Sequence, residues 1–291
     1  MLPEIQDEGK MLHSSVFSTV YLIDGKSVRK YPEASQFPDS PLVALENETC
    51  AYKTIGPHPR IARWIPAETA VAEYVEIEYY PHRSIRDYMQ KQNNQVPLAL
   101  RIKWGAQMIE ALAVIHAKGV IHSDLKLEQY LLDNDMNARL SDFNAASCPG
   151  RPALGYEKAT HFLPRPPEED NTVRTDLFAL GSTLYELAYG NFPYHELYPD
   201  EALLFSSSDS KLLAFYHQRQ GADAQVERAY EQGLFPDVSG SFCQNTILGC
   251  WNGNFASAQE ALLAYKSESR HMSAIDASCD AIATDEIKAA L

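Results

Sequence analysis

The stretch that decides the fold runs from Val120 to Ala146 and reads VIHSDLKLEQYLLDNDMNARLSDFNAA. Two short apolar runs within it, 130–132 and 138–140, flank an Asp-Asn-Asp turn, so we expect a short β-hairpin. Asp124 precedes this hairpin and Asp142 follows it. Because the two aspartates stand at the two ends of one hairpin just after a helix, the pattern predicts that both carboxylates face one cleft.

Two further polar side chains accompany this pair. Lys126 lies two residues beyond Asp124, and Gln129 lies three beyond Lys126. Phosphoryl transfer needs a carboxylate that orients and deprotonates the attacking hydroxyl, a cation for the moving phosphoryl oxygens, and oxygen ligands for magnesium. A single aspartate after a strand is more often a turn former or a helix cap. The four residues together, in this order and spacing, favour phosphoryl transfer.

The stretch resembles the protein kinase family, whose catalytic loop reads HRDLKxxN and whose metal-binding turn reads DFG. The matching residues here are His122-Ser123-Asp124-Leu125-Lys126 and Asp142-Phe143-Asn144. The resemblance implies that Asp124 is the catalytic base, that Lys126 contacts the γ-phosphate of ATP, and that Asp142 holds Mg²⁺ between the β- and γ-phosphates. It extends over most of the chain.

The same resemblance implies an α+β, bilobal protein-kinase-like fold, with a small antiparallel β lobe and a larger, mainly helical lobe. The order of elements agrees, because β-rich runs come first and helical patterns follow. We predict an N-terminal nucleotide-binding lobe over 1–80, a C-terminal catalytic and helical lobe over 81–266, and a tail over 267–291, together forming one kinase domain.

Apolar spacing and turn residues predict the individual elements. They are a hairpin turning at Asp24-Gly25, a helix within 41–56, strands within 62–68 and 72–80, and helices over 98–119 and 175–190. Asp176 resembles the family's aspartate that opens the central helix and braces the catalytic loop. Its simpler role is that of an acidic residue at a helix N-terminus.

Lys30 is placed like the family's lysine that holds the α- and β-phosphates of ATP. Glu48, in the following helix, is placed like the partner of that lysine. Glu46 competes for the same role, and the distance to the His58-Pro59 stretch favours Glu48. Lys30 as an ordinary exposed strand residue is the simpler alternative.

The loop that covers the phosphates in the family reads GxGxxGxV, and no glycine of it is kept here. The corresponding positions, implied by the resemblance to contact ATP, are His13, Ser15, Ser18 and Val20. A side chain at these positions keeps backbone amides away from the phosphates, although serine can donate hydrogen bonds. The grip on the γ-phosphate is therefore expected to be weaker than in the family.

The segment VEIEYY, residues 75–80, resembles the strand and hinge that bind adenine through backbone groups. Its implied nucleotide contacts are Ile77, which guards the rear of the pocket, Glu78 and Tyr80. An ordinary core strand has the same pattern, and both descriptions can hold together.

Three residues depart from the family within the catalytic stretch. Ser123 replaces an arginine that binds a phosphorylated activation loop, so control by that route is not expected. Gln129 stands where the family has its second metal-binding asparagine, which implies a Mg²⁺ ligand on a side chain one methylene longer. Asn144 replaces a flexible glycine, and asparagine tolerates left-handed backbone angles well.

The APE ending of the family becomes Leu163-Pro164-Arg165, without its glutamate. The CWNGNFASAQEALLAYK segment lacks the arginine that normally pairs with that glutamate. We therefore expect one buried ion pair to be lost as a unit, which leaves no orphaned charge. These segments are similar to those of divergent kinase-like proteins of fungi.

Composition narrows the remaining choices. The chain has 291 residues and a net charge of -14 without a Lys/Arg run, which disfavours nucleic acid as a partner. Its five cysteines are scattered and show neither a disulfide framework nor a zinc spacing, so reduced thiols are expected. The sequence has no apolar stretch long enough to span a membrane and no basic leader. A cytoplasmic or nuclear protein is expected.

These observations predict an ATP- and Mg²⁺-dependent Ser/Thr-type protein kinase whose second substrate is a protein. The alternative is a catalytically weak or inactive pseudokinase that acts as a binding module, since the glycines are lost and Gln129 is altered. A small-molecule phosphotransferase shares part of the pattern, but Lys126 and the DLFALGSTLYEL helix disfavour it. Substrate, activating signal and oligomeric state leave no mark in these residues.

Overall fold

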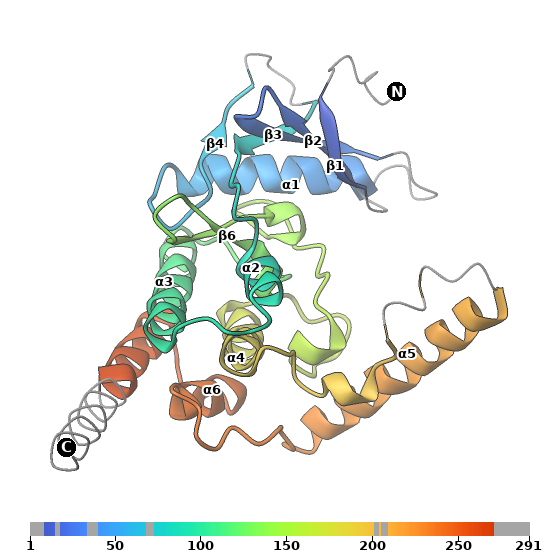
Figure 1. Ribbon diagram of the computed structural model, residues 1–291, viewed down its shortest axis with the longest axis vertical. Coiled ribbons are helices and arrows are strands. Elements are labelled where there is room, and N and C mark those ends of the chain that lie inside the picture. The colour runs from blue at the N-terminus through green and yellow to red at the C-terminus, as the bar shows by residue number, and fades with distance from the viewer. Residues whose placement is uncertain are drawn as a thin grey trace, which may run out of the picture.

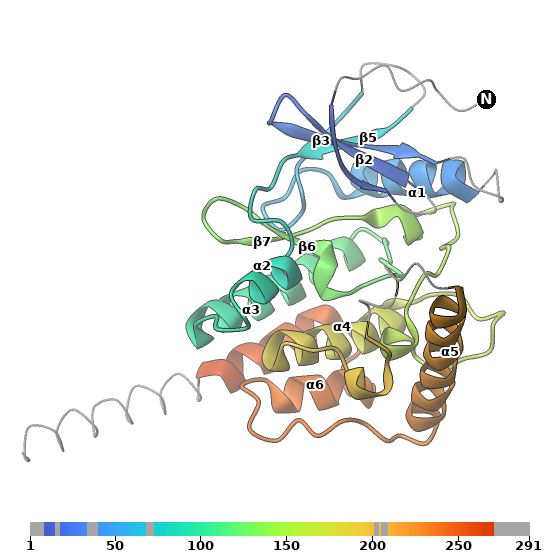
Figure 2. The ribbon, with the colours of Figure 1, turned by 45° about the vertical axis from the view of Figure 1, so that its right-hand side comes forward.

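The computed structural model describes residues 9–14, 18–33, 40–67, 73–200, 204 and 209–270. A small β lobe stands on a larger helical lobe, and α1 lies along the sheet on the side that faces the large lobe (Figures 1 and 2). The predicted bilobal α+β fold is confirmed.

The small lobe is one antiparallel five-stranded sheet in the order β1-β2-β3-β5-β4. Its elements are β1 (Lys10–Ser14), β2 (Ser18–Ile23), β3 (Ser27–Pro32), α1 (Ser40–Ile55), β4 (Trp64–Ile65) and β5 (Val75–Glu78). Asp24 and Gly25 between β2 and β3 both have positive φ, 49° and 67°. Two such residues form the tight turn whose twist matches that of the strands, as the Asp-Gly pair predicted.

The large lobe begins after β5 and is built on two buried helices. Its helices are α2 (Ile85–Lys91), α3 (Leu98–His116), α4 (Val173–Tyr189), α5 (Asp209–Glu231), α6 (Gln244–Trp251) and a helix over 258–270. The predicted hairpin is present as β6 (Tyr130–Leu132) paired with β7 (Ala138–Leu140). Short 3₁₀ turns are η1 (Leu127–Gln129), η2 (Phe143–Ala145), η3 (Ala159–His161) and η4 (His195–Leu197).

Close approach between helices fixes the core of this lobe. A Cβ atom on Gly105 of α3 would collide with the ring of Tyr265, and one on Gly181 of α4 would press on Trp251 of α6. Tyr265 also donates a hydrogen bond to the carbonyl of Ile102 over 3.1 Å. These contacts hold together the helices on which the catalytic loop rests. The last helix continues to residue 270, past the predicted tail boundary at 266.

A disulfide joins the two lobes. Cys50 of α1 is bonded to Cys148, which follows η2, and their Cα atoms are 6.6 Å apart. The expectation of reduced thiols is therefore wrong for this pair, because two positions 98 residues apart in sequence meet only in the folded chain. Cys243 and Cys250 are free and buried, and Cys279 lies outside the described residues. Among the described residues no helix is long and apolar enough to cross a membrane.

Candidate active site

A cleft of 790 Å³ opens between the lobes, under β1 to β3 and above the catalytic loop. Its lining contains every residue that the sequence predicted for nucleotide, catalysis or metal, apart from Ser15. Ser15 lies outside the described residues. Residues far apart in sequence thus converge on one opening.

The upper corner of the cleft holds three charged side chains. Lys30 of β3 lies 3.0 Å from Glu48 Oε2 of α1 and also contacts Asp142. The predicted contact between Lys30 and Glu48 is therefore present. Glu46 instead contacts Arg151 on the other side of α1 over 2.5 Å. Phe143 packs against Tyr52 of α1, with ring centroids 5.0 Å apart, so α1 and the Asp142 turn are packed together.

The floor of the cleft carries Asp124, which is 5% exposed. Its Oδ2 accepts hydrogen bonds from Lys126 Nζ at 2.6 Å and from Gln129 Nε2 at 3.2 Å. Gln129 is thus turned towards the aspartate by its amide nitrogen. The glutamine side chain is one methylene longer than the family's asparagine, and it reaches Asp124 from this position.

Asp176 braces the catalytic loop, as the sequence predicted. Its two carboxylate oxygens accept hydrogen bonds from the backbone N–H of His122 at 2.8 Å and of Ser123 at 3.0 Å. The ring of His116 lies 2.9 Å from the same carboxylate. Ser123 has a φ of 63° and is buried, so the loop needs these bonds to hold a backbone conformation that serine rarely adopts.

Burial and neighbouring charges set the protonation of the acids. Burial raises the pKa of Asp124, against the opposing charge of Lys126. Burial also acts to raise the pKa of Asp142, but Lys30 outweighs it and brings that pKa to about 2. The pKa of Glu48 is raised by burial and only partly lowered again by Lys30. Asp142 is therefore the firmly ionised carboxylate of the cleft, and Asp124 the more basic one.

The oxygen ligands fit a magnesium ion that is shared with a nucleotide. The Asp142 side chain is 33% exposed in the cleft, and Gln129 lines the same cleft. Among the described residues no cluster of three acidic, His or Cys side chains could hold a metal alone. Magnesium commonly takes one or two protein carboxylates and completes its shell with phosphate oxygens. Asp142 and Gln129 could supply that smaller share.

The roof and the rear of the cleft hold the predicted nucleotide contacts that come from the sheet. All five residues of β1 are exposed, including His13, which pairs with Val20 of β2. Ser18, at the start of β2, is buried. At the rear, Ile77 pairs with Trp64 of β4, and the Glu78 backbone N–H donates to the Arg63 carbonyl at 2.9 Å.

The turn after β7 departs from what the sequence suggested. Asp142 itself has the left-handed backbone, with a φ of 63°, whereas Asn144 lies within the 3₁₀ turn η2. The replacement of glycine by asparagine is tolerated because the turn places its left-handed residue two positions earlier. Asn144 therefore does not need the tolerance of left-handed angles that the sequence argument gave it.

The segment before α4 has a different buried ion pair in place of the family pair that was expected to be lost. Arg165 donates two hydrogen bonds to Glu157, at 2.8 and 3.3 Å, and both side chains are largely buried. The Arg165 guanidinium also lies 4.5 Å from the Phe162 ring centroid. A positive residue thus stands where the family has its glutamate, with a new partner eight residues earlier.

Comparison with known proteins agrees with this geometry. The family model described as protein kinase domain matches residues 19–232. A bilobal fold with such a cleft between its lobes is typical of one class of phosphotransferases. The family model covers most of the chain. The chain belongs to the protein kinase family.

Individual relatives are distant. A probable serine/threonine-protein kinase of Dictyostelium discoideum is 30% identical over 145 residues, covering 48% of this chain and 16% of that protein. A serine/threonine-protein kinase-like protein of Arabidopsis thaliana is 29% identical over 153 residues, covering 49% and 43%. Receptor-interacting serine/threonine-protein kinase 1 of Homo sapiens is 24% identical over 208 residues, covering 68% and 30%. The chain spans less than half the length of each of these relatives.

Proposed function

We propose that this chain transfers the γ-phosphoryl group of ATP to serine or threonine hydroxyls of a protein substrate. The observation that carries the proposal is the convergence of Lys30, Asp124, Lys126 and Asp142 on one cleft between the lobes. The nucleotide-binding lobe ends near Tyr80 in this proposal, and the catalytic lobe follows.

Each group has a distinct task. Asp124 receives the proton of the acceptor hydroxyl, and burial favours this because it raises the pKa of that carboxylate. Lys126, 2.6 Å from Asp124, supplies a positive charge next to the transferring group. Lys30, held by Glu48, binds the more distant phosphates.

Asp142 and Gln129 would hold Mg²⁺, which neutralises phosphate charge when it is bound. Their geometry carries a consequence for binding. The Asp142 carboxylate contacts Lys30, so the nucleotide phosphates compete with this carboxylate for the lysine, and Mg²⁺ competes with the lysine for the carboxylate. We infer that the strength of metal-dependent nucleotide binding depends on how far this contact loosens.

The test compares the wild type with Asp124→Asn and Asp142→Asn, using Asp237→Asn as a control on an exposed carboxylate. We expect Asp124→Asn to lower kcat by roughly 10²–10⁴-fold, as loss of a general base does, and to leave nucleotide binding almost unchanged. Asp142→Asn should abolish magnesium-dependent ATP binding in calorimetry. Asp237→Asn should match the wild type in both assays.

Absence of turnover in the wild type, or turnover that neither substitution changes, rejects catalysis by these residues. Retained nucleotide binding without turnover would identify the chain as a pseudokinase. The loss of the glycines above the phosphates and the Gln129 contact to Asp124 favour that second function.

A further inference from the structure

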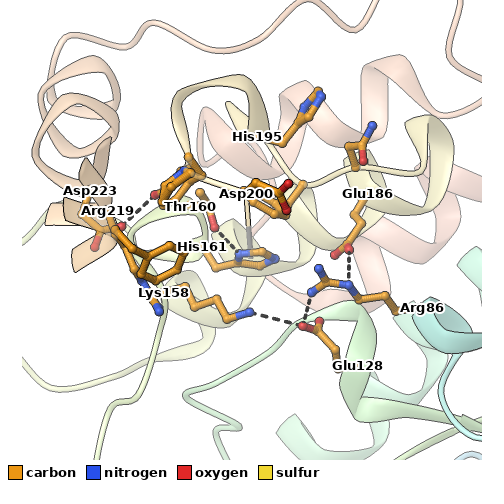
Figure 3. A pocket seen from close by; sticks show the side chains of 15 residues that line it. Arg86, Glu128, Lys158, Thr160, His161, Glu186, His195, Asp200, Arg219 and Asp223 are labelled. Carbon is orange, nitrogen blue, oxygen red and sulfur yellow. Dashed lines mark hydrogen bonds and ion pairs between the residues drawn. The ribbon is translucent and has the colours of Figure 1, made fainter. Parts of the chain in front are cut away.

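A second cavity, of 400 Å³, opens beside the catalytic cleft (Figure 3). Its walls come from α2, η1, η3, the end of α4, the 191–200 segment and α5. Glu128, Lys158 and Arg219 line both this cavity and the cleft that contains Asp124. Because the two cavities share these three residues, a peptide whose hydroxyl reaches Asp124 can extend a neighbouring side chain into the second cavity.

A chain of four charged groups forms one wall of this cavity. Figure 3 shows Lys158, Glu128, Arg86 and Glu186 joined in that order. Arg86 of α2 contacts Glu128, and its Nε lies 3.5 Å from Glu186 Oε1. Lys158 Nζ lies 3.2 Å from Glu128. The guanidinium of Arg86 thus stands between two carboxylates that come from the catalytic loop and from α4.

The two carboxylates differ in how well they are neutralised. Burial acts to raise the pKa of Glu128, but Lys158 and Arg86 together outweigh it and hold that pKa at about 2. Glu186 is 3% exposed, and its pKa is raised to about 7 by burial and by the charge of Glu128, against the charge of Arg86. At neutral pH Glu128 is therefore ionised, whereas Glu186 is close to half-protonated despite the charge of Arg86.

We propose that Arg86 fills, from within the chain, a subsite that would otherwise receive an arginine or lysine of the protein substrate. The proposal rests on the proposed kinase function and adds a specificity to it. A planar guanidinium with five donors matches two facing carboxylates, and Arg86 already supplies it. A basic substrate residue therefore finds Glu128 and Glu186 already paired with a cation of the chain itself.

The side chain that this subsite accepts is uncharged. Two cations, Arg86 and Lys158, face the two carboxylates, so this wall carries no net negative charge. Phe192 and Tyr198 form part of the remaining lining, with ring centroids 5.3 Å apart. Apolar or aromatic substrate residues can pack on these rings. The structure thus assigns a preference for such residues next to the phosphorylated hydroxyl.

The decisive experiment compares peptides that differ only in one residue near the acceptor serine, with alanine, phenylalanine or arginine scanned through each position. For the wild type we expect arginine to change kcat/KM less than twofold relative to alanine at every position, and phenylalanine to raise it at one position. Arg86→Ala should gain at least a tenfold preference for arginine at that same position. Arg228→Ala, on an exposed part of α5, is the matched control and should behave as the wild type.

A second measurement needs no turnover. Ethylguanidinium at millimolar concentration should raise the melting temperature of Arg86→Ala by several degrees, because it occupies the vacated place between the carboxylates. It should leave the wild type and the double variant Arg86→Ala/Glu186→Gln unchanged. Arg86→Met, which keeps most of the side-chain volume, serves for both measurements should the alanine variant not fold.

The two measurements separate the possible failures. Rescue by ethylguanidinium without peptide phosphorylation would reject the kinase function and keep the cation subsite. Turnover with a wild-type preference for arginine that Arg86→Ala abolishes would overturn the proposal. So would an Arg86→Ala or Arg86→Met protein that turns over, gains no arginine preference and is not rescued.

Discussion

The floor and the roof of the cleft are held in different ways. The floor, residues 121–129, is largely buried, and Asp176 and His116 tie it to the helices below. The roof strand β1 is exposed in all five residues and has none of the family's glycines. Buried hydrogen bonds leave little freedom to substitute residues, whereas an exposed strand tolerates change. The chain has thus kept the part that carries charge chemistry and altered the part that covers the nucleotide.

The largest effect is expected at the brace of the floor. Asp176→Ala removes the acceptor of two buried backbone N–H groups and of His116. We expect the free energy of unfolding to fall by roughly 3–5 kcal/mol, because the donors are left buried without partners. Urea denaturation measures it, with Asp237→Ala as the exposed control. A loss below about 1 kcal/mol would mean that the floor is not held by this carboxylate.

A smaller effect is expected at the ion pair between Arg165 and Glu157 in the segment before α4. Arg165→Met strands the buried carboxylate of Glu157 and should lower the free energy of unfolding by about 3 kcal/mol. The double variant Arg165→Met/Glu157→Gln removes the charge as well and should recover part of that loss. A double-mutant cycle read by thermal melting checks the coupling. Additive effects of the two changes would contradict a functional ion pair.

Stability should also respond to acid through His161 of η3, which lines the cavity beside the floor. Burial, then the charge of Lys158, lowers the pKa of His161 from 6.5 to about 3 in the folded protein. As pH falls below about 6.5 the unfolded chain takes up this proton and the folded one does not, so stability falls, by at most about 1.4 kcal/mol per pH unit. Glu186 acts oppositely, because its folded pKa of about 7 makes stability fall as pH rises from 4.5 to 7.

The substitution that isolates the histidine is His161→Gln. Its free energy of unfolding should fall less steeply than that of the wild type between about pH 6 and 4. This range lies between the pKa of His161 in the folded protein, about 3, and its value of 6.5 in the unfolded chain. Guanidinium or urea melts at each pH measure the slope. Equal slopes for the two proteins would assign the acid sensitivity to other groups.

The smallest effect is expected in the roof. His13→Gly removes an exposed side chain above the nucleotide and lets the backbone approach the phosphates. ATP should bind about threefold more tightly, which is less than 1 kcal/mol, and the melting temperature should hardly move. Nucleotide titration by calorimetry measures the change. A large loss of stability would show that β1 contributes to the fold more than its exposure indicates.

Local patterns in the sequence were enough to predict the floor. Short stretches with their own turn residues or apolar spacing predicted the β6–β7 hairpin and the buried helix α4. The order of Asp124, Lys126 and Asp142 is likewise visible within one short stretch. Lys30 followed from its place on a predicted strand that resembles the family's, and Glu48 from its distance to the His58-Pro59 stretch.

Contacts between distant or weakly patterned segments could not be predicted. The polar helix α5 has few buried residues, so its sequence shows no clear apolar stripe. Arg86 lies 42 residues from Glu128, and nothing local signals that they meet. The pairing of Glu157 with Arg165 depends on the path of the chain between them. These contacts depend on which side chains become buried next to each other, and the whole fold determines that, not the local sequence.

The bond between Cys50 and Cys148 closes a covalent ring of the chain that contains β4, β5, α2, α3 and the catalytic loop. Any single proteolytic cut inside this ring leaves the two fragments attached. Such a nicked protein migrates as one band in electrophoresis without thiol reductant and separates into two bands when reductant is added.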